Sequence, residues 1–203
     1  MSSSRPRVTY VIDDLGHGGA QRQLALTLGA LDGAVESTVV VLSDIVHPYA
    51  ERIRELGVPV EVIPRRAGLE ARRVSALART LGRFHTRIAH ATLDGSDAYT
   101  YFAAHACRIP AVLSLRSDRL HVTGGRARVL RWMMRHASAI TVNSQAGRTF
   151  LEKDLGVHPG RIHRVANIVD VPASPAPVRP QPGVIGVVGR LVDIKRFDVV
   201  IDA

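Results

Sequence analysis

Short runs of apolar and β-branched residues alternate with longer amphipathic segments along most of the chain. Runs of this length predict buried strands, and the segments between them have the spacing of covering helices. Strands that are each followed by a crossover helix form a mostly parallel sheet with helices on both faces, which is an α/β fold. The expected strands are residues 8–12, 38–42, 58–63, 87–90, 111–115, 139–142 and 161–165. The expected helices are residues 21–31, 49–56, 72–84, 99–107, 127–136 and 145–155.

A proline-rich stretch at residues 171–182 divides the chain. Repeated prolines remove backbone donors and favour an extended, semi-rigid conformation, so this stretch is expected to be an interdomain linker. Residues 1–170 are long enough for one complete domain with a sizeable core. Beyond the linker, residues 184–188 predict a strand and residues 196–203 the start of a helix. Because a lone strand cannot bury its own apolar face, residues 183–203 are expected to be the first strand and helix start of an incomplete second domain.

The chain is strongly basic, with a formal net charge of +9, and Lys153 and Lys195 are its only lysines. Such a charge suits nucleotide diphosphates, anionic lipid surfaces or nucleic acid. Nucleic acid is disfavoured because aromatic residues make up only 4% of the chain and no recognition module is present. The single cysteine, Cys107, fits a reducing compartment, and no stretch is apolar enough for a signal peptide or a membrane span. A cytoplasmic location is therefore expected.

A glycine-rich loop at residues 13–21 follows the first expected strand, and ligands in such sheets bind beyond the carboxyl ends of the strands. Gly16 and Gly18 have the spacing of a dinucleotide-binding loop, and free amides at the following helix attract phosphate. Gln21 stands at the third glycine position, and Asp44 lies later than the acidic residue that a nicotinamide site requires. A tight turn without a ligand is the alternative interpretation.

A second basic loop follows the expected strand at residues 184–188, where Arg190 comes after Gly189 and Lys195 lies five positions further on. Arginine has a planar donor fork that matches phosphate oxygens, and lysine adds a mobile point charge. The pair predicts a site for a departing nucleotide diphosphate. The alternative is two solvated surface charges.

Four motifs in order resemble a GT-B glycosyltransferase of the family-four type: residues 18–21, 142–144, 167–170 and 188–197. The resemblance implies two Rossmann-like domains, of which residues 1–170 would be the acceptor domain and residues 183–203 the start of the donor domain. It further implies sugar transfer from a nucleotide-sugar donor, usually with retention, and without a metal or other cofactor. The absence of an Asp-x-Asp pair from the chain is consistent with metal independence.

The resemblance also assigns roles on the donor side. Gly18 and Gly19 would lie against the donor phosphate and the acceptor entrance, and Arg190 and Lys195 would bind the donor diphosphate. Two residues would line the cleft: Asn143 and Ser144. Ser144 is also placed to cap the helix that begins at the next residue.

On the acceptor side, the resemblance implies catalytic roles for His90 and Arg116, which each end a strand. The alternative for His90 is a ring satisfied by backbone groups. Arg116 is too basic to be a general base but would orient an anionic acceptor or a donor phosphate. Its alternative is a salt bridge to Asp118 or Asp94.

The chain departs from the family pattern in two places. Ile168 stands where glycine is usual, and a β-branched residue tolerates positive φ poorly, so the turn is expected to differ. The acidic pair that normally recognises the donor sugar would lie beyond Ala203. The chain by itself is therefore expected to be inactive.

Arginines recur around apolar residues between Arg126 and Arg135, which predicts a basic amphipathic helix. Its contact with an anionic membrane surface, as in several relatives that use lipid-linked acceptors, is one interpretation. The other is an ordinary covering helix with Trp132 in the core and the arginines in water. The remaining histidines lack the spacing of metal ligands.

Three functions follow from these observations. The first is a retaining glycosyltransferase acting on an unknown glycan or lipid-linked acceptor. The second is a non-catalytic acceptor-domain protein that binds a phosphorylated ligand or pairs with a separate donor half. The third is a nucleotide-dependent oxidoreductase, which nicotinamide-cofactor binding would support.

Overall fold

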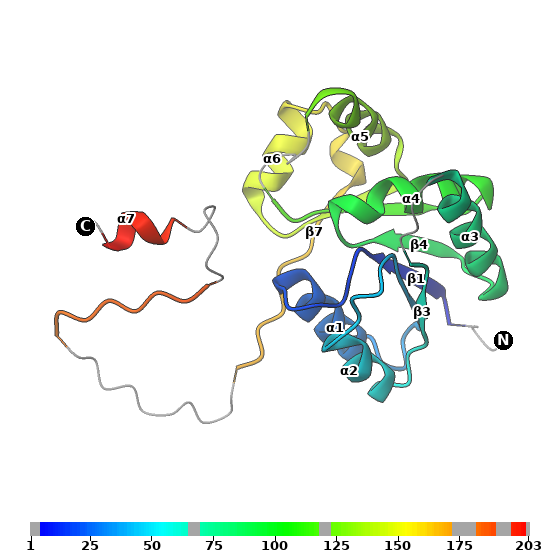
Figure 1. The fold of residues 1–203 in the computed structure, drawn as a ribbon. Coiled ribbons are helices and arrows are strands. Elements are labelled where there is room, and N and C mark those ends of the chain that lie inside the picture. Colours follow the sequence, from blue (N-terminus) through cyan, green and yellow to red (C-terminus); the bar gives the residue numbers. More distant parts are fainter. Residues whose placement is uncertain (1–4, 65–69, 118–122, 172–181, 190–195, 202–203) are drawn as a thin grey trace. The chain divides into compact units, whose positions relative to one another are not determined.

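The computed structural model describes residues 5–64, 70–117, 123–171, 182–189 and 196–201. The chain divides into two compact units, Met1–Ile168 and Val169–Ala203. The first unit contains one sheet and the helices that cover it (Figure 1). Each unit is described by itself below.

A seven-stranded, all-parallel sheet forms the centre of the first unit, with the order β3-β2-β1-β4-β5-β6-β7. The strands are β1 (Arg7–Ile12), β2 (Glu36–Val41), β3 (Val60–Val62), β4 (Ile88–Ala91), β5 (Ala111–Leu115), β6 (Ala139–Val142) and β7 (Ile162–Arg164). Each of the seven strands expected in this part of the sequence is present. The predicted parallel α/β sheet is confirmed.

Six helices connect these strands: α1 (Gly19–Ala30), α2 (Tyr49–Glu55), α3 (Glu70–Arg83), α4 (Asp94–Ala106), α5 (Gly124–His136) and α6 (Gln145–Lys153). A short 3₁₀ helix, η1 (Pro159–Arg161), precedes β7. The largest difference from expectation is at α4, which begins at Asp94 rather than at Tyr99. The Ser96 hydroxyl donates to the Leu93 carbonyl and accepts from the Leu93 backbone N–H. The polar residues 94–97, which resemble a loop in the sequence, therefore form the first helical turn.

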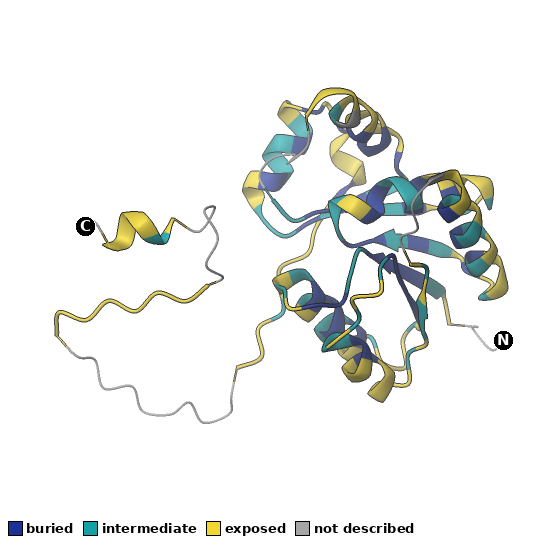
Figure 2. Ribbon diagram, in the orientation of Figure 1, coloured by how far each residue is buried: buried dark blue, intermediate teal, exposed yellow. Residues whose placement is uncertain are grey.

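Two apolar clusters lie on opposite faces of the sheet, as the alternation along β2 illustrates. Val39 and Val41 pack with α1 and α2, whereas Val40 packs with the cluster that includes the helices α3 to α6. All three side chains are fully buried. Figure 2 shows buried strands between helices whose outer sides are exposed. Strands covered on both faces explain the near-continuous apolar runs in the sequence.

The second unit contains α7 (Phe197–Ile201), in the region where the start of a helix was expected. The strand expected at residues 184–188 is not formed, since this segment has no pairing partner among the described residues. Val184 is 66% exposed and Ile185 is 83% exposed. A strand needs a neighbour for its backbone hydrogen bonds, and the described part of this unit provides none. Most of the proline-rich stretch, residues 172–181, lies outside the described residues.

Among the helices that the structure describes, none has the length and apolar character needed to cross a bilayer.

Candidate functional site at the carboxyl edge of the sheet

The sheet reverses its direction of growth between β1 and β4, because β2 and β3 extend it on one side and β4 to β7 on the other. In doubly wound sheets, ligands bind at such a switch point, beyond the carboxyl ends of the strands. The predicted site residues of the first unit all follow these strand ends or lie in them. The fold therefore brings to one edge residues that are far apart in the sequence.

The glycine-rich loop leads from β1 directly into α1. Asp14 organises it, since its Oδ1 accepts hydrogen bonds from the Gly16 backbone N–H and the Gln21 side chain, each at 2.9 Å. Gly18 precedes the helix and has no side chain to cap it, and a Cβ added to Gly19 would meet no atom within 4 Å. The Gln21 side chain lies against Gly18, where an added Cβ would collide with its Oε1. The amino end of α1 is therefore open beside Gly19, as a phosphate site requires.

A cluster of hydroxyl groups surrounds His90 near the end of β4. Its Nε2 lies 3.0 Å from the Ser114 Oγ and 3.4 Å from the Thr141 Oγ1, and these two oxygens are 2.8 Å apart. Burial, together with the nearby charge of Arg116, lowers the pKa of His90 to about 4. The Nε2 of the ring is therefore paired with side-chain hydroxyls rather than with the backbone. His90 is neutral at physiological pH.

Arg116 follows β5 and is partly buried. Its Nε is buried without a hydrogen-bond partner among the described residues, and burial lowers the pKa of the guanidinium. No ion pair joins it to Asp94 in the described part of the chain, and Asp118, the other expected partner, lies outside the described residues.

A small cavity of about 80 Å³ connects His90 and Arg116, and we refer to it as the carboxyl-edge cavity. Its lining comes from the ends of five strands and from α1, and includes Tyr10, Gln23 and Asn167. Asn143 lines it as well, whereas Ser144 does not. The Ser144 Oγ instead accepts a hydrogen bond from the Gly147 backbone N–H at 3.1 Å, which confirms the predicted helix cap.

The side chain of Gln23 holds the chain segment that follows β7. Its amide nitrogen donates to the Ile168 carbonyl at 2.8 Å, and its oxygen accepts from the Ile168 N–H at 2.7 Å. Ile168 is not among the described residues with positive φ, so the turn differs from one that needs glycine, as expected. This pairing fixes the wall of the carboxyl-edge cavity next to Asn167.

Two buried carboxylates near the end of β1 have no role in the sequence prediction. Burial raises the pKa of Asp13 to about 6, with smaller contributions from Asp14 and Asp94. Asp97 on α4 is completely buried, and burial raises its pKa well above the usual range. An acidic residue directly after a buried strand was the available signal for Asp13. Nothing in the sequence marks Asp97, because its burial depends on how α4 packs.

The donor-side prediction rests on the second unit. Arg190 and Lys195 both lie outside the described residues, and Gly189 before them is described as a bend. Their roles stay predictions.

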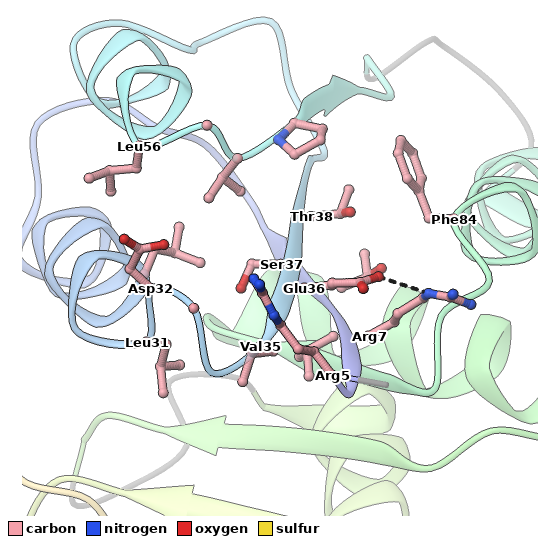
Figure 3. Close-up of a pocket in the computed structure, with 17 residues that line it drawn as sticks. Arg5, Arg7, Leu31, Asp32, Val35, Glu36, Ser37, Thr38, Leu56 and Phe84 are labelled. Atoms are coloured by element: carbon pink, nitrogen blue, oxygen red, sulfur yellow. Dashed lines mark hydrogen bonds and ion pairs between the residues drawn. The ribbon is translucent and has the colours of Figure 1, made fainter. Parts of the chain in front are cut away.

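A larger cavity, about 370 Å³, lies at the opposite edge, near the amino ends of β1 and β2 (Figure 3). Arg7 and Glu36 form an ion pair of 2.9 Å at its rim, with Asp32 and Phe84 on other sides. None of the predicted site residues lines it.

In the described ranges, no three histidine, cysteine or acidic side chains gather in a way that would hold a metal ion.

Several solved structures are similar to this fold. HepE of Anabaena in complex with UDP is 20% identical with a TM-score of 0.67, and the match covers 81% of this chain and 44% of HepE. The lipopolysaccharide outer core galactosyltransferase WaaB in its apo form is 13% identical with a TM-score of 0.65, over 87% and 50% of the two chains. MurG of Acinetobacter baumannii is 11% identical with a TM-score of 0.58, over 83% and 47%. The chain thus spans about half the length of these proteins and has the fold of GT-B glycosyltransferases over that half.

No match was found among curated proteins. A family model described as Glycosyltransferase Family 4 matches residues 17–172, which is more than half of the chain. This range includes the amino end of α1, the His90 cluster and the segment held by Gln23. The predicted family is confirmed: the chain belongs to glycosyltransferase family 4.

Proposed function

We propose that this chain is the acceptor-binding part of an enzyme that transfers a sugar from a nucleotide-sugar donor, with retention, to an acceptor bound at the carboxyl edge of the sheet. One observation carries the proposal: in a family-four chain, the amino end of α1, which is open at Gly19, and the carboxyl-edge cavity lie at the same edge of the sheet. The relatives add support, since HepE is described in complexes with UDP and with UDP-glucose.

In this proposal, the residues of the first unit bind and orient rather than form covalent bonds. Gly18 and Gly19 place backbone N–H groups toward a donor phosphate. Neutral His90 accepts a hydrogen bond from an acceptor hydroxyl, and the cation of Arg116 favours negative charge that develops nearby. Asn143 orients the ligand from the wall of the cavity. Ser144 acts through the α6 cap and not by contact.

The donor diphosphate is assigned to Arg190 and Lys195, in residues 183–203, which we propose begin the donor domain after the linker. Two cations beside a leaving diphosphate stabilise the negative charge that forms as the glycosidic bond breaks. Proton removal from the acceptor falls to the leaving phosphate itself, so a retaining reaction does not require Arg116 to act as a base. The chain alone is expected to lack transferase activity, because it spans only about half the length of similar glycosyltransferases.

The test compares this chain with a version that also contains the complete donor domain. Nucleotide-sugar hydrolysis is expected only for the longer version, with kcat/KM lowered about 100-fold or more by Lys195→Ala. Lys153→Ala is the matched control, because Lys153 is the only other lysine and lies exposed at the end of α6. Equal rates for the two lysine variants, or no turnover of any nucleotide sugar, would count against the proposal.

A binding role without catalysis is the second candidate. The observation that favours it is that described residues of the first unit suffice to form the carboxyl-edge cavity. This candidate predicts that the longer version binds a phosphorylated ligand without consuming a nucleotide sugar. Calorimetric binding together with the hydrolysis assay separates the two functions.

The surface of α5 supports a contact with an anionic membrane. Trp132 is 46% exposed and Val129 is 46% exposed, so the expectation that Trp132 lies in the core is wrong. Arg128 and Arg131 are exposed on the same helix, which has no acidic residue in its first turn. Exposed apolar side chains next to arginines match the surface of an anionic bilayer.

Co-sedimentation with vesicles containing phosphatidylserine tests this contact. Each of Arg128→Gln and Arg131→Gln is expected to weaken binding about fivefold, as one lost arginine costs about 1 kcal/mol. Arg72→Gln on α3 is the control, because Arg72 is also exposed on a helix. Equal loss in all three variants would point to net charge rather than to α5. A cytoplasmic location stays a prediction.

A further inference from the structure

Among the described residues Arg116 has no carboxylate partner, whereas three other arginines of the first unit have one. Arg7 pairs with Glu36 at 2.9 Å, Arg83 with Glu61 at 2.8 Å, and Arg148 with Glu152 at 2.7 Å. Within the described ranges no ion pair or hydrogen bond involves Arg116, although its Nε is completely buried. Buried charges in proteins are normally paired, because an unpaired charge loses its hydration without compensation.

The surroundings of Arg116 are suited to a negative charge. The carboxyl-edge cavity contains no aspartate or glutamate among its described lining residues. Besides His90 and Arg116, its polar lining consists of hydroxyl and amide groups, including the amides of Asn143 and Asn167. Such groups donate hydrogen bonds to an anion without repelling it.

The amino end of α6 adds positive potential at the same place. This nine-residue helix has no acidic residue in its first turn. A Cβ added to Gly147 would lie 3.2 Å from the Ser117 carbonyl oxygen, so the first turn of α6 packs against the residue after Arg116. The helix dipole therefore supplements the guanidinium charge. Gly147 is the residue that permits this close approach.

We infer that the carboxyl-edge cavity binds an oxyanion, a phosphate or carboxylate group carried by the acceptor substrate, with Arg116 as its counter-ion. The assignment of this group to the acceptor rests on the proposed function, whereas anion binding at Arg116 does not. The donor diphosphate is the other source of the same chemistry. One observation favours the acceptor: the cavity has a volume of about 80 Å³, which suits one small oxyanion rather than a nucleoside diphosphate.

His90 provides a reporter for this site. The positive charge of Arg116 contributes to the lowered pKa of His90. An anion that pairs with Arg116 cancels part of that charge, so it raises the pKa of His90. NMR of the His90 ring in this chain, titrated with inorganic phosphate and with UDP at several pH values, therefore measures binding and its electrostatic effect together.

In the wild-type chain, phosphate is expected to shift the His90 signals with saturation and to raise the His90 pKa. Arg116→Gln is expected to weaken phosphate binding at least about tenfold, and to raise the His90 pKa in the absence of phosphate. Arg116→Lys keeps the charge but loses the planar fork, so its affinity for phosphate is expected to lie between those of wild type and Arg116→Gln. Arg164→Gln, at an exposed arginine of β7, is the control and keeps the full phosphate response.

Three outcomes would overturn the inference: no saturable phosphate shift in the wild-type chain, the same shift in Arg116→Gln, or UDP that binds more tightly than phosphate at the same site. The last outcome would assign the anion to the donor. Each of these results is independent of nucleotide-sugar hydrolysis and of the Lys195 variant. A negative phosphate titration would not contradict the proposed transferase reaction. A negative hydrolysis assay would not contradict the anion site.

Discussion

Asp13 makes the stability of this protein depend on pH in a direction opposite to that of most surface carboxylates. It follows β1, and its carboxylate lies against Gly95 in the first turn of α4, where an added Cβ would collide with it. Burial is the main reason that its pKa rises to about 6, although a hydrogen bond from the Gly95 backbone opposes the shift. Its Oδ1 is buried without a partner in the described part of the chain. The ionised form is therefore disfavoured in the folded state.

The effect of Asp13 on the free energy of unfolding can be worked out from its pKa shift. A pKa of about 6 in the folded protein against 3.8 in the unfolded chain is a difference of about 2.2 units, or about 3 kcal/mol at 1.36 kcal/mol per unit. Because the folded pKa is raised, protonation of Asp13 adds this amount to the free energy of unfolding. The contribution is fully present below about pH 4 and is lost as the pH rises through about 6. One pH unit below the folded pKa, at about pH 5, about 1.4 kcal/mol has been regained relative to about pH 8.

Asp13→Asn removes this titration while it keeps the shape of the side chain. The variant is expected to be more stable than wild type at about pH 8, by up to about 3 kcal/mol, and the advantage should shrink by about 1.4 kcal/mol at about pH 5. Urea unfolding of both proteins at the two pH values measures the difference, in which the contribution of His90 cancels to first order.

The control is Asp154→Asn, at an exposed aspartate after α6, for which the difference from wild type is expected to be the same at both pH values. A stability difference between Asp13→Asn and wild type that does not change with pH would refute the reasoning. It would mean that Asp13 is hydrated in solution or gains a cationic partner.

Three further substitutions test the packing around the site. Gly95→Ala is expected to destabilise the fold by about 1–3 kcal/mol, because the added methyl group collides with Asp13. Adding Asp13→Gly to this variant should restore part of the lost stability. Unchanged stability of the Gly95→Ala variant would contradict the close contact. Gln23→Leu should expose the Ile168 amide to faster hydrogen exchange, since both backbone groups of Ile168 lose their partner, and unchanged protection would show that the pairing does not hold the segment. Met134→Ala on α5 should cost about 2–5 kcal/mol in denaturant unfolding, whereas a cost below about 1 kcal/mol would mean that the core collapses around the gap.

Local patterns predicted most of the fold because each strand is buried on both faces. Val39, Val40 and Val41 form a continuous apolar run that only a covered parallel strand explains. The start of α4 was missed because the residues from Asp94 to Asp97 favour turns in isolation. Their helical conformation depends on Ser96 bonding to Leu93 and on packing against the neighbouring strands.

The candidate site was predictable in part, for the same reason. Residues at strand ends, such as His90 and Arg116, were located correctly because a parallel sheet brings all carboxyl ends to one edge. The partners of His90 were not predicted, since Ser114 and Thr141 are adjacent to it only through the pairing of β4, β5 and β6. The exposure of Trp132 was also missed, because a helical pattern does not reveal which apolar residues the neighbouring helix covers.

The amino-acid sequence alone determined the alternation of strands and helices, the family, the cap at Ser144 and the basic charge, because each depends on residues that are neighbours along the chain. Only the tertiary structure decided the electrostatic state of the carboxyl edge. A pKa shift or an unpaired cation depends on which groups burial removes from water and which it brings together. Asp13, His90 and Arg116 acquire their unusual properties in that way, across separations that no local pattern encodes.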